Sequence, residues 1–400
     1  MKKIFSLFMT IVLTVTVTVS VFSGAGAIEA EAAVYNLPYY YHQLSEKEQG
    51  WYKQIKSAAL ANKRSVKLSG KLDEETLTKL VNLIYYYDVQ VFHLGTDISA
   101  EIHSSYATLG LSYTMTNESF KNATAKLEKE AEKVLSKFDE DTKTYTKIKT
   151  IHDYIINNCD YDKSAKYSDT PFGALCKGKA KCDGYSYAFA YLCSRAGIRT
   201  VNVIGQTDEG HMWNKVYYNK KWYNVDVTYD DPVGNTKKNL SYAYFMVDDA
   251  QFNRNHTPDK CAFKIPEATD SSKTYYSVNK LNATDYTSAK EVLTSAIAKA
   301  AKNKKTSVTI HFDSEAHLNS AVNKLEGNNG TELFNLLEAA QKKCKTKFVT
   351  TGCLSYSDPI TCTYTIYIFY PKTKLSDYYN NPSEVDTSTK EMLNKLGVAA

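Results

Sequence analysis

The feature that most constrains this chain is a cysteine at the predicted start of an amphipathic helix. Cys182 follows a segment with two glycines and two nearby lysines, and the predicted helix ends at Gly197, a common helix terminator. Its apolar positions recur at helical spacing: Tyr185, Ala188, Phe189 and Leu192. The N-terminal end of a helix stabilises negative charge, so we expect Cys182 to be nucleophilic there. The free N–H groups at the same helix end could also bind a developing oxyanion.

A strand and a hairpin are predicted directly after this helix. The strand covers Thr200 to Gln206, and the arms of the hairpin cover His211–Tyr218 and Lys221–Thr228. Asn219-Lys220 forms the turn, where asparagine tolerates the required positive φ.

This hairpin brings a histidine and an aspartate together. Pairing Tyr218 with Lys221 puts Trp213 opposite Asp226 and makes His211 a diagonal neighbour of Asp226. The predicted core face carries Met212, Val216, Tyr223, Val225 and Val227, and the other carries His211, Trp213, Asn224 and Asp226. A carboxylate beside an imidazole fixes its tautomer, so the pattern predicts a nucleophile, a base and an orienting group.

Each of these residues also has an ordinary structural interpretation, and the joint pattern is what favours catalysis. Taken by itself, Cys182 would be interpreted as a buried thiol or as half of a disulfide. A Cys176–Cys182 disulfide would remove the nucleophilic thiol. If Cys182 is free, seven other cysteines remain, and Cys353 with Cys362 could bridge a hairpin. No CxxC pair, phosphate loop or dinucleotide motif occurs, so we expect no metal and no cofactor.

The N-terminus predicts export. Two lysines precede an apolar run from Ile4 to Phe22, and small residues follow, which is the layout of a secretory signal peptide over residues 1–32. Cleavage is expected after Ala27 or Ala32; an uncleaved membrane anchor is the alternative. We therefore expect a secreted or cell-surface protein that leaves the membrane once the signal is removed. A net charge of only +5 without a basic block argues against a nucleic-acid partner.

The rest of the chain predicts two small α/β modules around a central domain. We expect modules at 33–116 and 275–372, the core at 117–265 and a polar tail at 373–400 with a short helix at Thr387–Leu396. In the first module, residues 44–70 are predicted to form a helix followed by a strand at Ser65–Leu68, and a second helix is predicted from Asp73 to about Tyr86. Strands are also predicted at Val89–His93 and Tyr106–Met115. The same order returns near an offset of 241, so the modules are either related or alike by chance.

Motifs across residues 117–262 resemble the bacterial transglutaminase-like superfamily. They are Ile151-His152-Asp153-Tyr154, Tyr161-Asp162, Gly178-Lys179-Ala180-Lys181-Cys182-Asp183-Gly184-Tyr185, His211-Met212-Trp213-Asn214 and Trp222-Tyr223-Asn224-Val225-Asp226-Val227-Thr228-Tyr229-Asp230-Asp231-Pro232. The resemblance implies an α+β, papain-like core in which a helix bearing the cysteine packs on an antiparallel sheet. It also implies that Cys182 is the nucleophile, His211 the general base and acid, and Asp226 the orienting residue of acyl transfer through a thioester.

The chain departs from the family pattern at several positions. Met212 replaces a small residue, Tyr229 replaces a tryptophan, and residues 151–181 contain neither Gln nor Trp as an oxyanion donor. Tyr161 or Tyr167 could supply that donor, and Trp213 is a further candidate for substrate contact.

The expected substrate is a peptide or protein amide, with a cell-wall association as one option, and hydrolysis or deamidation is favoured over crosslinking. The main alternative is a non-catalytic cell-surface or cell-wall binding module with the same fold. A papain-type protease is less consistent with the sequence because the orienting residue is Asp rather than Asn.

Overall fold

The computed structural model describes residues 37–231, 240–371, 373, 374, 376, 378 and 387–395. The chain divides into two compact units. The first contains the chain up to Trp222 and returns for Thr257–Glu267; the second contains Tyr223–His256 and everything from Ala268 onward. The predicted signal peptide and most of the polar tail lie outside the described residues. Within the described ranges, no helix combines the length and the apolar character that crossing a membrane requires.

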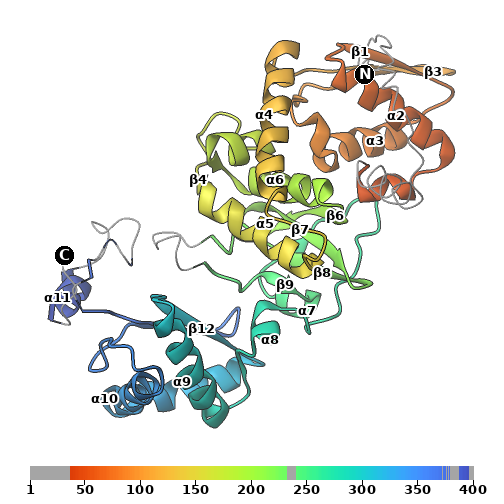
Figure 1. Ribbon diagram of the computed structural model, residues 1–400. Coiled ribbons are helices and arrows are strands. Elements are labelled where there is room, and N and C mark those ends of the chain that lie inside the picture. The colour runs from red at the N-terminus through yellow and green to blue at the C-terminus, as the bar shows by residue number, and fades with distance from the viewer. Residues whose placement is uncertain are drawn as a thin grey trace. The chain divides into compact units, whose positions relative to one another are not determined.

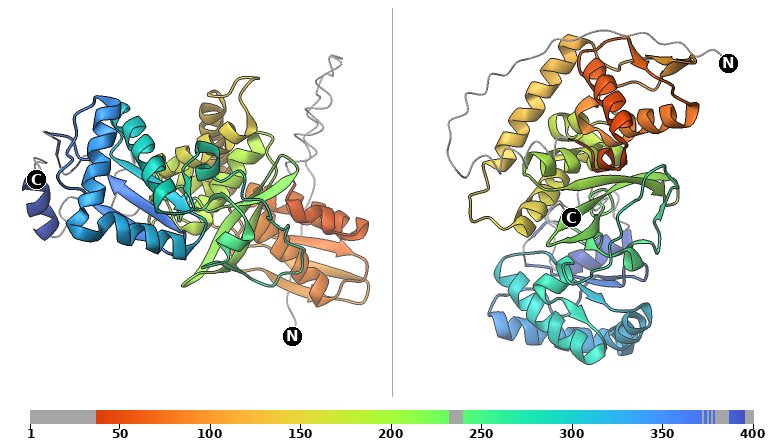
Figure 2. Two further views of the ribbon diagram at one scale, coloured as in Figure 1. Left: turned by 90° about the horizontal axis from the view of Figure 1, so that it is seen from below. Right: turned by 90° about the vertical axis from the view of Figure 1, so that its right-hand side faces the viewer.

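The first unit begins with a small α/β module, labelled in Figure 1. Its elements are the 3-10 turn η1 (Tyr39–Gln43), α2 (Glu46–Leu60), β1 (Ser65–Ser69), α3 (Glu74–Tyr87), the 3-10 turn η2 (Val89–Val91), β2 (Ser99–Ile102) and β3 (Tyr106–Gly110). The antiparallel strands have the order β1-β3-β2. Figure 2 shows α2 and α3 along one face of this sheet, where Val66, Leu68 and Leu109 are buried.

One predicted strand of this module is wrong. Residues Val89–His93 form the turn η2 and the segment after it, because the Asp88 side chain accepts the N–H of Gln90 and starts a helical turn. The second strand of the module is instead Ser99–Ile102, a short edge strand of mostly polar and small residues.

The central part of the first unit is built around α6 (Cys182–Arg195). The other elements are α4 (Asn117–Leu135), α5 (Thr144–Asn158), β4 (Asp160–Tyr161), the π-helical turn η3 (Gly173–Lys177), β5 (Lys179–Ala180), β6 (Thr200–Gln206), β7 (Gly210–Tyr218) and β10 (Thr257–Pro258). Helix α6 contacts β6 and β7 of the sheet and also contacts α4 and α5 (Figure 1). A mixed α+β core with the Cys182 helix on an antiparallel sheet is therefore confirmed.

The sheet beneath α6 has the strand order β10-β6-β7-β8-β9. Strands β6 and β7 pair antiparallel from Thr200↔Val216 to Gln206↔Gly210. The predicted turn at Asn219-Lys220 is confirmed, since both residues have positive φ, 50° and 63°. Strand β8 (Lys221–Val225) ends three residues before its predicted end at Thr228.

The second unit holds the end of β8 and a second α/β module. Its elements are β9 (Phe245–Val247), α7 (Asp249–Phe252), α8 (Tyr275–Asn279), β11 (Asn282–Ala283), α9 (Tyr286–Lys302), β12 (Ser307–Phe312), α10 (Glu315–Cys344), β13 (Ser355–Asp358), β14 (Thr363–Tyr367) and α11 (Thr387–Lys395). The module's sheet has the order β11-β12-β14-β13. Helix α10 is interrupted by non-helical backbone from Gly327 to Gly330, so it consists of two helical segments.

The two modules share their order of elements and their strand arrangement. In each, a helix, a strand and a second helix precede two strands, and the last strand lies between the other two: β1-β3-β2 and β12-β14-β13. The Tyr113 hydroxyl donates to the carbonyl of Lys63 at 2.6 Å, and the Tyr370 hydroxyl donates to the carbonyl of Lys305, also at 2.6 Å. The two structures therefore repeat a specific side-chain contact as well as a topology.

The cysteines are free thiols, all eight of them within the described residues. The disulfide considered between Cys353 and Cys362 is therefore not formed, and neither is the one between Cys176 and Cys182.

Candidate active site

Cys182 is the first residue of α6 and is buried. Lys181 precedes it in extended backbone, so the helix begins at the thiol as the sequence predicts. The Sγ of Cys182 donates to Oδ1 of Asp183 at 3.1 Å, and Oδ2 of Asp183 lies 3.0 Å from Nζ of Lys181. The helix end favours negative charge on Sγ, whereas the Asp183 carboxylate opposes it and Lys181 offsets part of that opposition. No sequence pattern predicted that this neighbouring carboxylate would contact the thiol.

The segment before the helix holds Cys182 in place through backbone contacts. Strands β4 and β5 pair in parallel, with Tyr161 opposite Ala180. The N–H of Lys181 donates to the carbonyl of Ser168 at 2.9 Å. Gly184 allows this close approach, because a Cβ there would lie 2.3 Å from the same Ser168 oxygen.

The three residues considered for oxyanion or substrate contact have different surroundings. Tyr161 is 41% exposed, and its pKa is raised to about 12, first by burial and then by the nearby Cys182 thiol. Tyr167 has a positive φ of 69° and packs edge-on against Phe172. Trp213 is fully buried. Of the three, Tyr161 combines exposure with an electrostatic influence from Cys182.

Hydrogen bonds join helix α6 to β7, the strand that carries His211. The Ser186 hydroxyl, one turn after Cys182, donates to the carbonyl of Met212 at 2.7 Å. The amide of Asn214 donates to the carbonyl of Ser186 at 3.1 Å and to Oδ1 of Asn202 at 2.9 Å. All of these groups are buried, which makes the contact between helix and strand specific.

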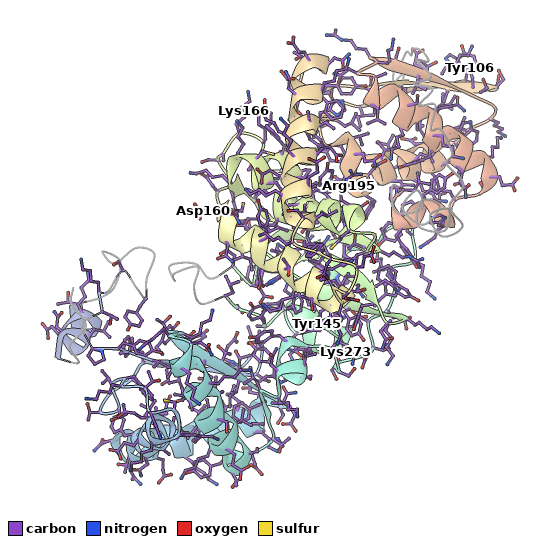
Figure 3. All side chains as sticks on the ribbon, viewed as in Figure 1. Tyr106, Tyr145, Asp160, Lys166, Arg195 and Lys273 are labelled. Carbon is purple, nitrogen blue, oxygen red and sulfur yellow. The ribbon has the colours of Figure 1, made fainter. Side chains whose placement is uncertain are left out.

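The other end of α6 is held by α4. Arg195, labelled in Figure 3, lies 2.7 Å from Oε2 of Glu128, and the Tyr191 hydroxyl donates to Oε1 of the same residue at 2.8 Å. The helix is therefore fixed at both ends.

His211 lies on β7 and is buried beside Trp213, whose ring is nearly parallel to the imidazole at 6.2 Å between centroids. The face predicted to be outside the core is thus also covered: Trp213, Asn224 and Asp226 are all at most 1% exposed. Gly205, opposite His211 in the β6–β7 register, leaves the space for this packing, since a Cβ there would meet the Trp213 ring at 2.6 Å.

Asp226, in the second unit, follows the end of β8 instead of lying within the predicted strand. Its Oδ1 accepts the N–H groups of Thr228 at 2.9 Å and Tyr229 at 3.0 Å. This turn explains why the strand stops early: the carboxylate binds its own following backbone in place of a partner strand.

A second histidine, which the sequence analysis missed, contacts this carboxylate. Nε2 of His256 lies 3.1 Å from Oδ2 of Asp226, and both side chains are almost completely buried. No local pattern marked His256, because its contact with Asp226 spans thirty residues and depends on the tertiary fold.

Asp226 and His256 have side chains of the types that bind metals. Both oxygens of Asp226 are already engaged by hydrogen bonds within the second unit, so we assign no metal or cofactor to them.

Burial changes the acidity of three other thiols in the chain. Burial raises the pKa of Cys176 to about 11 and that of Cys353 to about 12, and it also raises the pKa of Cys193 strongly. These thiols stay protonated near neutral pH and are poor nucleophiles.

Comparisons with known proteins agree with the class of fold that this geometry defines. Residues 132–227 match the model of the transglutaminase-like superfamily. The chain is 29% identical over 136 residues to kyphoscoliosis peptidase of Mus musculus and, to the same degree, of Homo sapiens. These matches cover 28% of this chain and only 21% of each relative, so the chain spans about a fifth of their length.

Two solved structures are also similar in part. A crystal structure of a TGase is 19% identical with a TM-score of 0.25, covering 41% of this chain and 50% of that one. A putative cysteine protease from Cytophaga hutchinsonii is 17% identical with a TM-score of 0.23, covering 32% and 55%.

The fold class that this geometry defines is thus a thiol-bearing helix packed on an antiparallel sheet. Residues 132–227 of the chain form a core of the transglutaminase-like superfamily.

Proposed function

We propose that the chain is a secreted, cysteine-dependent hydrolase or acyltransferase acting on peptide or protein amides. The observation that carries this proposal is Cys182 at the N-terminus of a helix that is bonded, through Ser186, to the strand bearing His211. Strand β8 is the neighbour of β7 in the sheet order, which supports the predicted hairpin, and Asp226 directly follows the end of β8. We propose Asp226 as the orienting partner of His211 on this basis.

The chemistry follows from these groups. His211 takes the Cys182 proton, and the thiolate attacks the amide carbonyl to form a tetrahedral adduct. The N–H groups at the start of α6 and the Tyr161 hydroxyl stabilise the oxyanion. His211 then protonates the leaving amine, and water hydrolyses the thioester; an amine in place of water would give a crosslink. Asp226 holds the imidazole in the tautomer that this sequence needs.

A non-catalytic binding module is the second candidate. Its support is the Cys182 Sγ–Asp183 contact, which keeps a carboxylate beside the thiol, together with the absence of Gln or Trp from residues 151–181.

Alkylation of the full chain by iodoacetamide, mapped by mass spectrometry, separates the two candidates. At pH 7 we expect Cys182 to react much faster than Cys176, Cys193 and Cys353, whose raised pKa values make them internal controls. We expect His211→Ala to remove the advantage of Cys182 without changing the controls. Equal labelling of Cys182 in both proteins would contradict the catalytic proposal and favour the binding module.

Export is also proposed, on the predicted signal peptide. N-terminal sequencing of protein from the culture medium should give a start after Ala27 or Ala32.

We further propose that the two α/β modules are copies of one ancestral unit. An offset of 242 residues relates Lys63 to Lys305, one residue from the predicted 241, and an offset of 257 relates Tyr113 to Tyr370. Chance similarity of common α/β patterns would not require the same tyrosine–carbonyl contact at matching positions.

A further inference from the structure

A groove runs along α3 in the N-terminal module, within the first unit. Its volume is about 550 Å³. Its two walls are formed by side chains of α3 and of the segment that contains β2: Leu77, Val81, Tyr85, Ile98, Ala100 and Ile102. A groove of this size with mostly apolar walls is typical of a binding site.

Strand β2 leaves part of the apolar face of its sheet uncovered beside this groove. Leu109 on β3 is buried, whereas its partner Ala100 is half-buried and Ile102 is 42% exposed. Within the described residues, β2 pairs with β3 and forms an edge of the sheet. A further strand added at such an edge would place every second side chain on the face that carries Ala100 and Ile102. The groove therefore fits an extended peptide that adds to the sheet.

One end of the groove is acidic. Of the described residues that line it, Glu74 alone is charged, and it is exposed at the start of α3. Glu75 and Asp97, which are also exposed, adjoin lining residues in the sequence and add negative charge. Lys79 on the same helix lies 2.8 Å from Glu48 and is paired there. A ligand with a basic side chain at this end would complement these charges.

The other end of the groove lies beside the start of α6. The Tyr187 hydroxyl of α6 donates to the carbonyl of Tyr85 at 3.4 Å. Burial raises the pKa of Tyr85, and the carboxylate of Asp183 is among the charges that raise it further. The same carboxylate accepts the hydrogen bond from Sγ of Cys182. The groove therefore leads from Glu74 toward the candidate nucleophile.

We propose that this groove binds the peptide substrate as an extended strand beside β2, with apolar side chains against α3 and a basic side chain near Glu74. From Glu74 to Tyr85 the helix rises about 16 Å, which an extended peptide covers in about five residues. The basic residue is thus about five residues from the amide that Cys182 attacks. This rests on the proposed function, because it takes that amide to be the substrate of Cys182.

Binding of two synthetic peptides to the full chain, measured by fluorescence anisotropy, tests the groove. Both contain five residues of alternating valine and threonine; one has lysine at both ends and the other has glutamate, so either strand direction can be detected. We expect the lysine peptide to bind about fivefold more tightly, with a difference that shrinks as salt is added. Equal affinities would overturn the proposal.

Two variants change the groove itself. Ile102→Glu should weaken binding of the lysine peptide at least about tenfold, and Glu74→Lys should remove the preference for lysine over glutamate. Val278→Glu in the second unit and Glu118→Lys in the first turn of α4 are matched controls with exposed side chains, and they should change neither result. The replaced side chains are exposed, so all four variants should unfold at the wild-type urea concentration. Tight, lysine-selective binding in both groove variants would overturn the proposal.

Iodoacetamide labelling separates failure of this proposal from failure of the function. We expect saturating lysine peptide to slow labelling of Cys182 but not of Cys176 or Cys353, and Ile102→Glu to remove the protection. Binding without protection would show that the groove does not lead to Cys182, and would overturn the proposal. If labelling of Cys182 depends on His211 but neither peptide binds, the function stands and the groove is wrong.

Two other results would assign the groove to a different occupant. If the lysine peptide binds but Cys182 labels no faster than the control thiols, the proposed function fails, the substrate role falls with it, and the groove belongs to a binding module. A dimer in light scattering that Ile102→Glu abolishes would assign the groove to a second copy of the chain and would also overturn the proposal.

Discussion

Replacing Gly184 by alanine should destabilise the first unit, whereas the same replacement at Gly50 should stabilise it. Both glycines lie inside helices, so alanine gains about 1 kcal/mol of helix propensity at either position. At Gly50 a new Cβ would meet nothing within 4 Å. At Gly184 it would lie 2.3 Å from the Ser168 carbonyl oxygen and 2.7 Å from Cβ of Ala180.

The cost at Gly184 exceeds the gain in propensity. Moving the Ser168 oxygen away would stretch its 2.9 Å hydrogen bond from the N–H of Lys181. Overpacking of this kind costs about 1–3 kcal/mol, and a weakened hydrogen bond adds about 1 kcal/mol. The net loss at Gly184 is thus about 1–3 kcal/mol, against a gain of about 1 kcal/mol at Gly50.

Urea unfolding followed by tryptophan fluorescence measures this difference. The chain has three tryptophans, Trp51, Trp213 and Trp222, and all belong to the first unit. Because the displaced backbone leads directly into Cys182, Gly184→Ala should also slow iodoacetamide labelling of that thiol, whereas Gly50→Ala should not. If the two variants shift stability in the same direction, the packing argument at the start of α6 is refuted.

Two further predictions concern the modules. Burial lowers the pKa of His93 to about 4, below the ordinary value of 6.5, so the first unit should have its full stability above pH 6.5 and lose it as the pH falls toward 4. Urea unfolding should show a loss of about 2 kcal/mol between pH 7 and pH 5 that His93→Leu largely removes; an unchanged slope would contradict this origin. Tyr113→Phe and Tyr370→Phe should each cost about 1 kcal/mol, because each removes the matching hydroxyl–carbonyl bond. Hydrogen exchange should rise in β1–β3 for the first variant and in β12–β14 for the second, and a response in only one module would argue against equivalence.

Local sequence patterns predicted the elements that their own residues determine. The start of α6 at Cys182 and the turn at Asn219-Lys220 follow from apolar spacing and from residues that accept positive φ. The predicted strand at Val89–His93 failed because an alternating apolar run was overridden by Asp88, whose side chain caps a 3-10 turn. Edge strand β2 gave no signal, since a short, mostly polar edge lacks the apolar alternation of a buried strand.

The candidate site was predictable up to the point where its groups depend on distant partners. Cys182, His211 and Asp226 could be proposed from helix and hairpin periodicity, although Asp226 lies just past the end of β8 and not within it. Asp183 was visible as the next residue, but its effect depends on the rotamer that brings Oδ1 to the thiol. His256 lies thirty residues from Asp226 and reaches it only through tertiary folding.

Asp226 illustrates why the departure from regular structure occurs at this position. If the strand continued through Thr228, the backbone N–H groups of Thr228 and Tyr229 would bind a neighbouring strand or solvent. Because the strand ends at Val225, both N–H groups instead donate to the Asp226 carboxylate. A buried carboxylate needs several donors to remain ionised, and two backbone groups together with the imidazole of His256 supply them. The orienting role proposed for Asp226 requires it to keep its charge and direction while buried, and an early strand end meets both needs at once. The same reasoning predicts that Asp226→Asn, which cannot carry the charge, would lose the His211-dependent labelling of Cys182 even if the turn is retained.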